Sequence, residues 1–234
     1  TAGIAAQARN SNALWSLSVG ANAGGDLGVA GSVSYSTVDN TSRATATDAV
    51  LRSDGTVRLL ADDASSVRSI AGAASFSGKA GFGAGLGLTE VANSTQATLL
   101  RSSVSAQALD AQATAGNEVI AASAALAITG SGVAGSGAVT VNTIDNDTAA
   151  LATQSTVATT GAASLQARDD SSILSIAGSL AFSGGAAGIG GAAAYNAIGS
   201  RTRTLASGSS LGGASVALQA QQLSDITAVA AGGA

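Results

Sequence analysis

Apolar and polar residues alternate along most of the chain with a period of two residues. Such alternation is typical of β-strands with one buried face, whereas an amphipathic helix would repeat every 3.6 residues. Clear examples are Val57–Ala61, Gly31–Thr37 and Leu14–Val19. Equivalent runs follow at Ala163–Ala167, Val216–Ala220, Gly137–Thr143 and Ile173–Gly178. The pattern predicts an all-β protein, although alanine on its own favours helices.

The alternating runs belong to a repeat of 53 residues. Ser69–Gly72 returns as Ser175–Gly178, and Phe76–Gly78 returns as Phe182–Gly184, each two periods later. The chain holds about 4.4 units, which are expected to form a single array over 1–234. The expected divisions are a partial unit 1–8, complete units 9–61, 62–114, 115–167 and 168–220, and a partial unit 221–234. Because neither end resembles the polar cap that solenoid arrays need, we expect a piece of a longer array.

The small residues that dominate the chain suggest how the repeats are stacked. Parallel strands place equivalent positions of successive rungs about 4.8 Å apart, and a flattened coil has room only for Ala, Ser and Gly between its sheets. The interior is expected to hold Gly31, Ala84, Gly137 and Gly190 in its narrow part, and Val33, Leu86 and Val139 in its wider part. The absence of Pro agrees with strands paired on both edges.

These features predict a parallel β-solenoid. A repeat of 53 residues exceeds one common solenoid rung, so we expect two rungs of about 26 residues in each repeat. Eight or nine such rungs would make a rod of about 40 Å. An antiparallel array of long hairpins, which turn at the Gly-rich stretches, is the alternative that the periodicity leaves open.

Three kinds of turn are expected in each repeat. The repeat column that consists of Asn40, Asn93, Asn146 and Gly199 combines the residue types that best tolerate positive φ, so we expect a structural turn there. A second turn is expected at Asp62-Asp63 and Asp169-Asp170. The third is expected at the Gly-rich stretches Gly24–Asp26, Gly78–Gly81 and Gly184-Gly185.

Composition excludes several kinds of chemistry. The chain contains no Cys and no His, so disulfides, thiolate chemistry, zinc fingers, haem ligation by His and a Ser-His-Asp triad are impossible within it. A net charge of −4 argues against a nucleic-acid partner. The stretches 119–144 and 171–200 are uncharged, but Ser, Thr, Asn and Gly interrupt them, and flanking cations and aromatic residues are missing. No membrane-spanning segment is therefore expected.

Local motifs have structural explanations that outweigh chemical ones. Gly130–Gly135 matches a dinucleotide-binding pattern, but a strand rather than a helix follows it. Asp145 and Asp147 carry oxygen ligands suited to calcium, yet their partners in other repeats are not acidic. Phe76 and Phe182 share one column and are expected in the core. Sequons begin at the three asparagines of the turn column, with glycosylation as the alternative to a plain turn.

A recurrent element gives the chain a family resemblance. The segment 135–148 and the similar Ala30–Ser42, followed by segments such as Ala163–Ser172, resemble the repeats of large filamentous surface adhesins of Gram-negative bacteria. These are similar to filamentous haemagglutinin and to leukotoxin-type filamentous adhesins. The resemblance implies a secreted, elongated β-solenoid shaft at the cell surface, and it offers no functional residues to carry over.

The expected function is therefore structural. The chain is expected to be a spacer or scaffold segment of a secreted filament or adhesin stalk, with further copies of the same repeat in a longer parent chain as partners. Self-association into filaments is a further expectation. The alternative is a repeat binding surface for a cell surface, a glycan or another copy. No enzyme activity, no cofactor, no metal site and no catalytic residue is expected, because clustered acids and bases are lacking.

Overall fold

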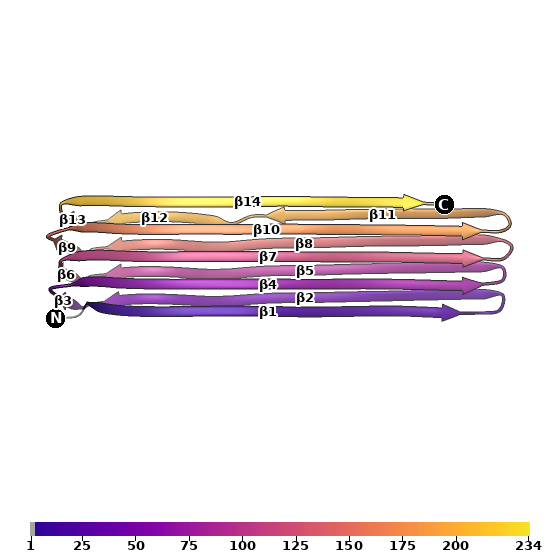
Figure 1. Ribbon diagram of the computed structural model, residues 1–234, viewed down its shortest axis with the longest axis horizontal. Coiled ribbons are helices and arrows are strands. Elements are labelled where there is room, and N and C mark those ends of the chain that lie inside the picture. The colour runs from indigo at the N-terminus through magenta and orange to yellow at the C-terminus, as the bar shows by residue number, and fades with distance from the viewer. Residues whose placement is uncertain (1–2) are drawn as a thin grey trace.

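The alternating runs form long β-strands in the computed structural model, which describes residues 3–234. Every strand pairing among these residues is parallel, and no helix occurs within 3–234. The predicted parallel β-solenoid is therefore confirmed. Figure 1 shows the coils stacked one over another, with the two termini at opposite ends of the stack.

Each complete coil contributes one strand to each of three sheets, except that the last complete coil contributes two strands to one of them. Sheet A consists of β1 (Ile4–Ala23), β4 (Thr56–Ser77), β7 (Ala108–Thr129), β10 (Ala162–Ser183) and β14 (Ser215–Gly233). Sheet B consists of β2 (Leu27–Thr47), β5 (Ala80–Leu100), β8 (Val133–Thr153), β11 (Ala187–Ile198) and β12 (Arg201–Ser207), of which β11 and β12 both belong to the last complete coil. Sheet C consists of the short strands β3 (Val50–Arg52), β6 (Ser103–Ala106), β9 (Thr156–Thr159) and β13 (Ser210–Gly212).

One 53-residue repeat forms one coil of the solenoid, not two. Ile4 pairs with Val57 in sheet A, and Leu27 pairs with Ala80 in sheet B, both at a spacing of 53 residues. The expectation of two rungs per repeat is wrong, because strands of 19 to 22 residues use the whole repeat in a single coil. The antiparallel alternative is also wrong, because the two long strands of a coil lie in different sheets and do not pair.

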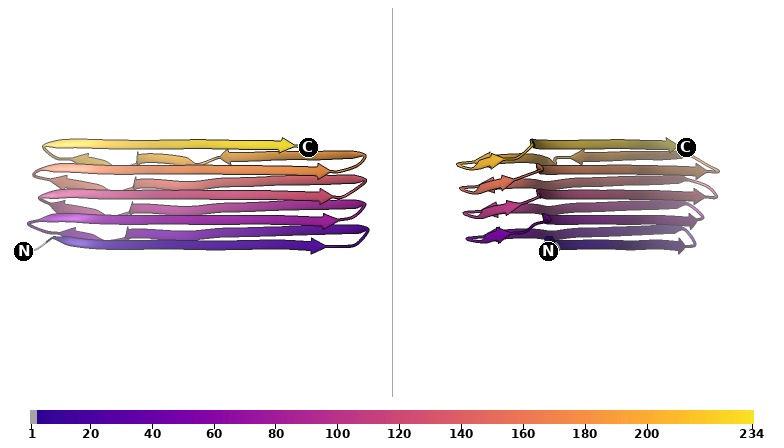
Figure 2. Two further views of the ribbon diagram at one scale, coloured as in Figure 1. Left: turned by 45° about the vertical axis from the view of Figure 1, so that its right-hand side comes forward. Right: turned by 60° about the vertical axis from the view of Figure 1, so that its left-hand side comes forward.

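The long strands make the molecule wide rather than tall. A strand of 22 residues spans about 70 Å, whereas five strands in a stack rise about 20 Å. The longest axis of the molecule accordingly runs along the strands, as Figures 1 and 2 show. The expected rod of about 40 Å along the stack is therefore wrong.

The spacing between coils varies by one residue. Val57 pairs with Leu109 at a spacing of 52, and Leu109 pairs with Ala163 at a spacing of 54. In sheet B, Arg201 pairs with Asp147, again at a spacing of 54. Ser200 rather than Gly199 therefore occupies the position equivalent to Asn146.

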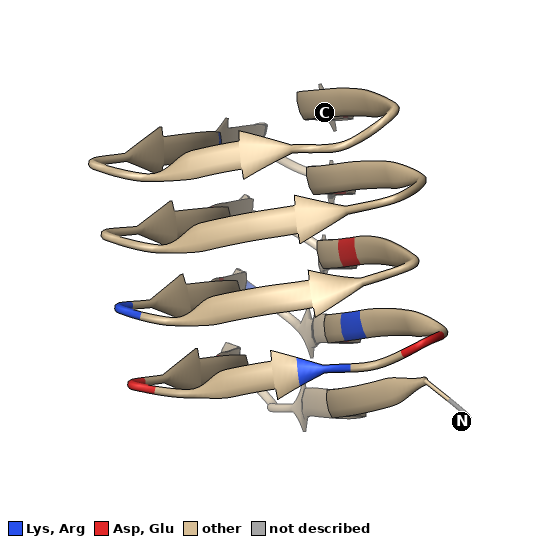
Figure 3. Ribbon diagram, turned by 90° about the vertical axis from the view of Figure 1, so that its left-hand side faces the viewer, with Lys and Arg blue, Asp and Glu red and all other residues tan. Residues whose placement is uncertain are grey.

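Turns lie at the two ends of the long strands. The Gly-rich stretches do turn the chain from sheet A to sheet B, as predicted, for example at Gly24–Asp26 between β1 and β2. The turn from sheet B to sheet C contains a column of residues with positive φ. This column consists of Asp48 (φ 51°), Arg101 (47°), Gln154 (49°) and Gly208 (58°). Sheet C lies at this end of the molecule, where its short strands stack as Figure 3 shows.

The turn predicted at the asparagine column is wrong. Asn40, Asn93 and Asn146 lie inside β2, β5 and β8, and none of them has a positive φ. Gly199 lies in the break between β11 and β12.

The second predicted turn is also wrong. The pairs Asp62-Asp63 and Asp169-Asp170 lie inside β4 and β10. Both predictions fail for the same reason. Every second residue of a long strand points into the interior, and a polar residue at such a position can stay inside the strand when polar partners satisfy it there.

The interior narrows from the sheet C end to the Gly-rich end. Where three sheets enclose it, the core contains leucines and valines such as Leu59, Leu99 and Leu109. Where only sheets A and B enclose it, the core first contains valines and isoleucines such as Val67 and Ile144. Nearest the Gly-rich turns it contains Gly, Ala and Ser. A Cβ added at Gly83 would lie 2.6 Å from the carbonyl oxygen of Leu126 in the facing sheet. The predicted narrow interior is thus present.

Gly190 points into this interior, as predicted. The other residues predicted for it are, however, one position out of phase. Gly31 and Ala84 point outward, and Val33 and Val139 lie on the outer face of sheet B with exposed fractions of 61% and 37%. A shift of one residue moves every side chain of a strand to its other face.

Candidate functional site: an internal polar seam and an outer apolar face

The asparagine column forms an internal polar seam between sheets A and B. Asn40 Nδ2 donates to Ser65 Oγ at 3.0 Å, and its Oδ1 accepts from Asn12 Nδ2 at 2.8 Å. Asn93 Nδ2 donates to Asp63 Oδ1 at 2.9 Å. These bonds cross from one sheet to the other, so the seam fixes the two sheets relative to each other at this level of the core.

The seam continues into the upper coils through Asn146. Its Nδ2 donates to Asp169 Oδ2 at 2.9 Å and to Ser171 Oγ at 3.1 Å. The Ser171 hydroxyl in turn donates to Asp169 Oδ1 at 2.6 Å. In the last coil Ser200 takes the equivalent place, and its Oγ accepts from the backbone N–H of Asn146 at 3.4 Å. The predicted column is therefore a structural column, but of buried amides rather than of turns.

Two buried carboxylates belong to this seam. Asp63 and Asp169 have exposed fractions of 1% and 0%. Burial raises the pKa of Asp63 above its ordinary value, and the hydrogen bond from Ser65 offsets part of that rise. Burial likewise raises the pKa of Asp169, against hydrogen bonds from Ser171 and Asn146. Within residues 3–234 neither carboxylate forms an ion pair, so both are costly to keep ionised inside the fold.

Hydroxyl pairs hold the narrow part of the core together. Ser34 Oγ lies 2.7 Å from Ser16 Oγ and 2.9 Å from Ser69 Oγ. In higher coils Thr140 Oγ1 lies 2.6 Å from Ser175 Oγ. Small hydroxyl side chains thus fill the space that Leu and Val fill at the other end, which explains why the chain contains so much serine.

The residues considered for chemistry lie apart. Asp145 and Asp147 point outward from β8 rather than forming a loop, and Asp147 pairs with Arg203 at 3.1 Å. No group of three or more acidic, His or Cys residues that could hold a metal ion occurs within residues 3–234. The sequon asparagines Asn40, Asn93 and Asn146 are buried, with exposed fractions of 9%, 3% and 1%. Their amides face the interior and are bonded there.

The largest side chains of the Gly-rich half lie outside the coil. On sheet A, every second residue of the segments 15–23, 68–76, 120–128, 174–182 and 227–233 points outward. We name this surface the sheet A apolar face. Phe76 and Phe182, predicted to lie in the core, belong to it and have exposed fractions of 43% and 51%. That prediction is wrong because alternation identifies two faces but does not say which one is buried.

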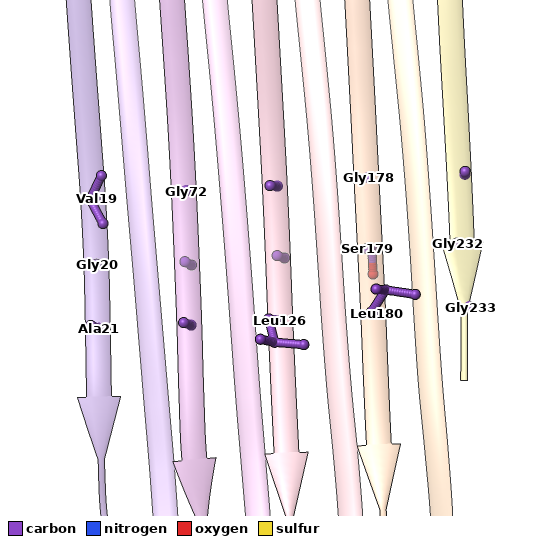
Figure 4. A pocket seen from close by; sticks show the side chains of 15 residues that line it. Val19, Gly20, Ala21, Gly72, Leu126, Gly178, Ser179, Leu180, Gly232 and Gly233 are labelled. Carbon is purple, nitrogen blue, oxygen red and sulfur yellow. The ribbon is translucent and has the colours of Figure 1, made fainter.

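A groove crosses the sheet A apolar face at right angles to the strands. Its floor is the column Val19, Gly72, Ala124, Gly178 and Ala231, in which every residue after Val19 is small, and its volume is about 660 Å³. Leu126 and Leu180 border it on one side, as Figure 4 shows. Ile70 and Ile176 border the groove on its other side, two residues before Gly72 and Gly178. The face is therefore a groove between two apolar ridges.

Sheet B carries a similar outer surface over the same half of the molecule. Tyr35 and Tyr195 are each 61% exposed, and Ile189 is 68% exposed. A groove of about 510 Å³ there contains Gly31, Ala84 and Gly137. Beyond this half, the outer residues of both sheets become polar. Both sides of the slab are therefore apolar toward the Gly-rich end and polar toward sheet C.

Sequence reasoning missed these outer faces, although a signal was present. In the segment 15–19, Trp15, Leu17 and Val19 alternate with Ser16 and Ser18. The narrow interior accepts only the serines, so the large residues must point outward.

Comparison with known proteins adds no relative. No family model, no curated protein and no solved structure matches the chain. Within residues 3–234 the structure contains no helix that is long and apolar enough to cross a membrane.

Proposed function

We propose that the chain is a structural, non-enzymatic segment of a secreted cell-surface filament or adhesin stalk, in which it acts as a scaffold. The observation that supports this proposal best is the unbroken parallel ladder. Sheet A continues through five strands, and residues such as Ile4, Val57, Leu109, Ala163 and Val216 follow one another in a single column. Regular stacking of this kind gives a stiff body without any need for a catalytic cleft.

The open edges of the stack suit a longer assembly. Within the described chain, β1 pairs only with β4, and β14 pairs only with β10. Each end strand therefore presents an unpaired row of backbone donors and acceptors. Further copies of the same repeat in a longer parent chain would pair with these rows and extend the ladder in both directions.

The geometry also refines what kind of scaffold is proposed. Each coil uses 53 residues but raises the stack by only about 4.8 Å. A body of this shape gains little length for each residue and a great deal of flat surface. The proposed scaffold is therefore a broad, stiff slab.

Immunogold electron microscopy tests the proposed location. Antibodies raised against the purified chain are applied to intact cells of the source organism. We expect labelled filaments or projections at the cell surface. Label that appears only after the cells are opened would contradict the proposal.

A second candidate function is a repeat binding surface, which the two exposed apolar faces favour. Deletion of residues 31–83 separates the two candidates, because Gly31 pairs with Ala84 and the junction therefore stays in phase. A scaffold should keep the adhesion of the source cells and lose only one coil. Adhesion that disappears with one coil would favour the binding surface instead.

A further inference from the structure

We infer that the sheet A apolar face is an interface with a second copy of this chain, packed face to face about a two-fold axis parallel to the stack. The inference does not depend on where the protein is located, so it stands or falls separately from the proposed surface function. Three features support the inference: the groove in this face, the apolar residues that border the groove, and the area of the face.

The face combines exposed apolar side chains with almost no charge. Leu17 and Val19 have exposed fractions of 72% and 71%, and Leu180 of 49%. Among the outward residues of the five segments the only charge is Arg68, whose guanidinium lies 4.8 Å from the centre of the Trp15 ring. A contiguous apolar surface of this size on a protein marks a site of interaction.

The dimensions of the face match those of a stable interface. Nine residues along a strand span about 30 Å and five strands about 24 Å, which gives about 700 Å². Two such faces would bury about 1,400 Å², within the range for specific protein–protein interfaces.

The order of large and small residues makes three of the five coils of the face complementary to themselves. In three of the five coils a large residue is followed two positions later by a small one: Ile70 by Gly72, Ile176 by Gly178, and Val229 by Ala231. The third coil has two small residues in these columns, Ala122 and Ala124, and the first coil has two large ones, Leu17 and Val19. A two-fold axis that lies between these two columns and parallel to the stack reverses the strand direction and keeps each coil level. It therefore sets Ile70 of one copy opposite Gly72 of the other, and Ile176 opposite Gly178, in both directions at once. In the second, fourth and fifth coils, the larger residue of each copy therefore packs against the smaller residue of its partner.

Sheet A suits this contact better than sheet B. Sheet A presents five strands in continuous register, whereas the sheet B ladder has four strands on this half. The groove on sheet A is also larger than the groove on sheet B, with a volume of about 660 Å³ against about 510 Å³. An isologous contact of this kind closes on itself and gives a dimer.

The first test fills the groove without disturbing the fold. A Cβ added at Gly72 or Gly178 meets no atom within 4 Å, so Gly72→Val combined with Gly178→Val should fold as the original chain does. Gly116 has the same free space on the polar half of the same sheet, which makes Gly116→Val the matched control. Sedimentation velocity over a concentration series should show a dimer for the original chain and for Gly116→Val. The double variant should have a dissociation constant at least about tenfold higher, equivalent to about 1.4 kcal/mol.

A second pair of variants identifies which face is used. Ile176→Lys places a charge on sheet A, and Ile189→Lys places the same charge on sheet B. The inference expects Ile176→Lys to be monomeric and Ile189→Lys to dimerise as the original chain does. Circular dichroism and thermal unfolding establish that both variants remain folded.

Three outcomes would overturn the inference. The first is an original chain that stays monomeric over the whole concentration series, and the second is association that survives in folded Ile176→Lys. The third is a monomer that instead sediments with phosphatidylcholine vesicles through the same face, which would assign the face to a lipid surface.

Discussion

At the scale of single residues, the buried carboxylates of the seam make stability depend on pH. Burial raises the pKa of Asp63 and of Asp169. The folded state therefore holds a proton at a pH where the unfolded chain has already lost it. Stability from these groups is complete below the ordinary Asp pKa of about 3.9 and is lost as the pH rises through the folded pKa. Asp48 acts in the opposite direction, because the hydrogen bond from Arg101 lowers its pKa.

The first prediction concerns this pH dependence. Asp63→Asn combined with Asp169→Asn should raise the free energy of unfolding at pH 7 by about 1–3 kcal/mol, because a poorly compensated buried charge is removed. It should also flatten the rise in stability that we expect of the original chain as the pH falls toward the ordinary Asp pKa of about 3.9. Denaturant unfolding at several pH values measures both effects. Asp225→Asn, on the exposed last coil, is the control and should change neither quantity.

Positive φ at the turn from sheet B to sheet C gives a second prediction. Gln154 adopts φ 49°, which favours glycine, so Gln154→Gly should stabilise the fold by about 0.5–1 kcal/mol. Gln166→Gly, inside β10, should destabilise it by a similar amount, because glycine in a strand loses more chain entropy on folding. Thermal unfolding compares the two variants. If both variants raised the unfolding temperature, or both lowered it, by the same amount, the turn assigned at Gln154 would be contradicted.

The asparagine column shows how far single residues could be predicted. Its regular spacing marked Asn40, Asn93 and Asn146 as structural, but asparagine suits a left-handed turn and a buried amide ladder equally well. The true turn column contains Asp48, Arg101 and Gln154, where backbone bonds to the next coil, such as Asp48 N–H to Leu100 O at 3.0 Å, hold the conformation. Such bonds depend on the register between coils, which single residue types do not encode.

At the scale of strands, the interior spacing explains the choice of residues. Sheets A and B approach so closely near the Gly-rich turns that an added Cβ at Gly83 would lie 2.6 Å from the backbone oxygen of Leu126. Backbone cannot move aside as a flexible side chain does. Glycine at this inward position is therefore required by space rather than by a turn.

This requirement gives the third prediction. Gly83→Ala should destabilise the protein by about 1–3 kcal/mol through overpacking. Gly178→Ala, at an outward position with free space around it, should leave stability unchanged or raise it by up to about 1 kcal/mol. Thermal unfolding followed by far-ultraviolet circular dichroism measures both. A destabilisation of the same size in both variants would contradict the narrow core.

The strands also show what periodicity can and cannot predict. Alternation correctly identified strands and the Gly-rich stretches correctly identified one turn. The length of the strands was missed, because a polar inward residue such as Asp63 looks like a break in the pattern. The orientation of Val33 and Phe76 was missed because a period of two divides residues into two faces without naming the buried one.

At the scale of the whole molecule, the central claim is that each repeat makes one coil. This arrangement determines the width of the slab, the size of its faces and the column in which each residue lies. The repeat length of 53 was visible in the sequence, whereas the number of coils in each repeat was not, since stacking of one or two coils gives the same period.

Distance measurement between spin labels tests this claim most directly. The chain contains no Cys, so Gln7→Cys and Gln219→Cys place labels at two sites only. Both positions lie on the outer surface of sheet A, four coil steps apart in one column through Leu60, Gln112 and Gln166. Dilution with unlabelled chain suppresses distances between copies. One coil per repeat predicts a distance of about 19 Å in pulsed electron paramagnetic resonance, whereas a distance of about 38 Å would contradict the account.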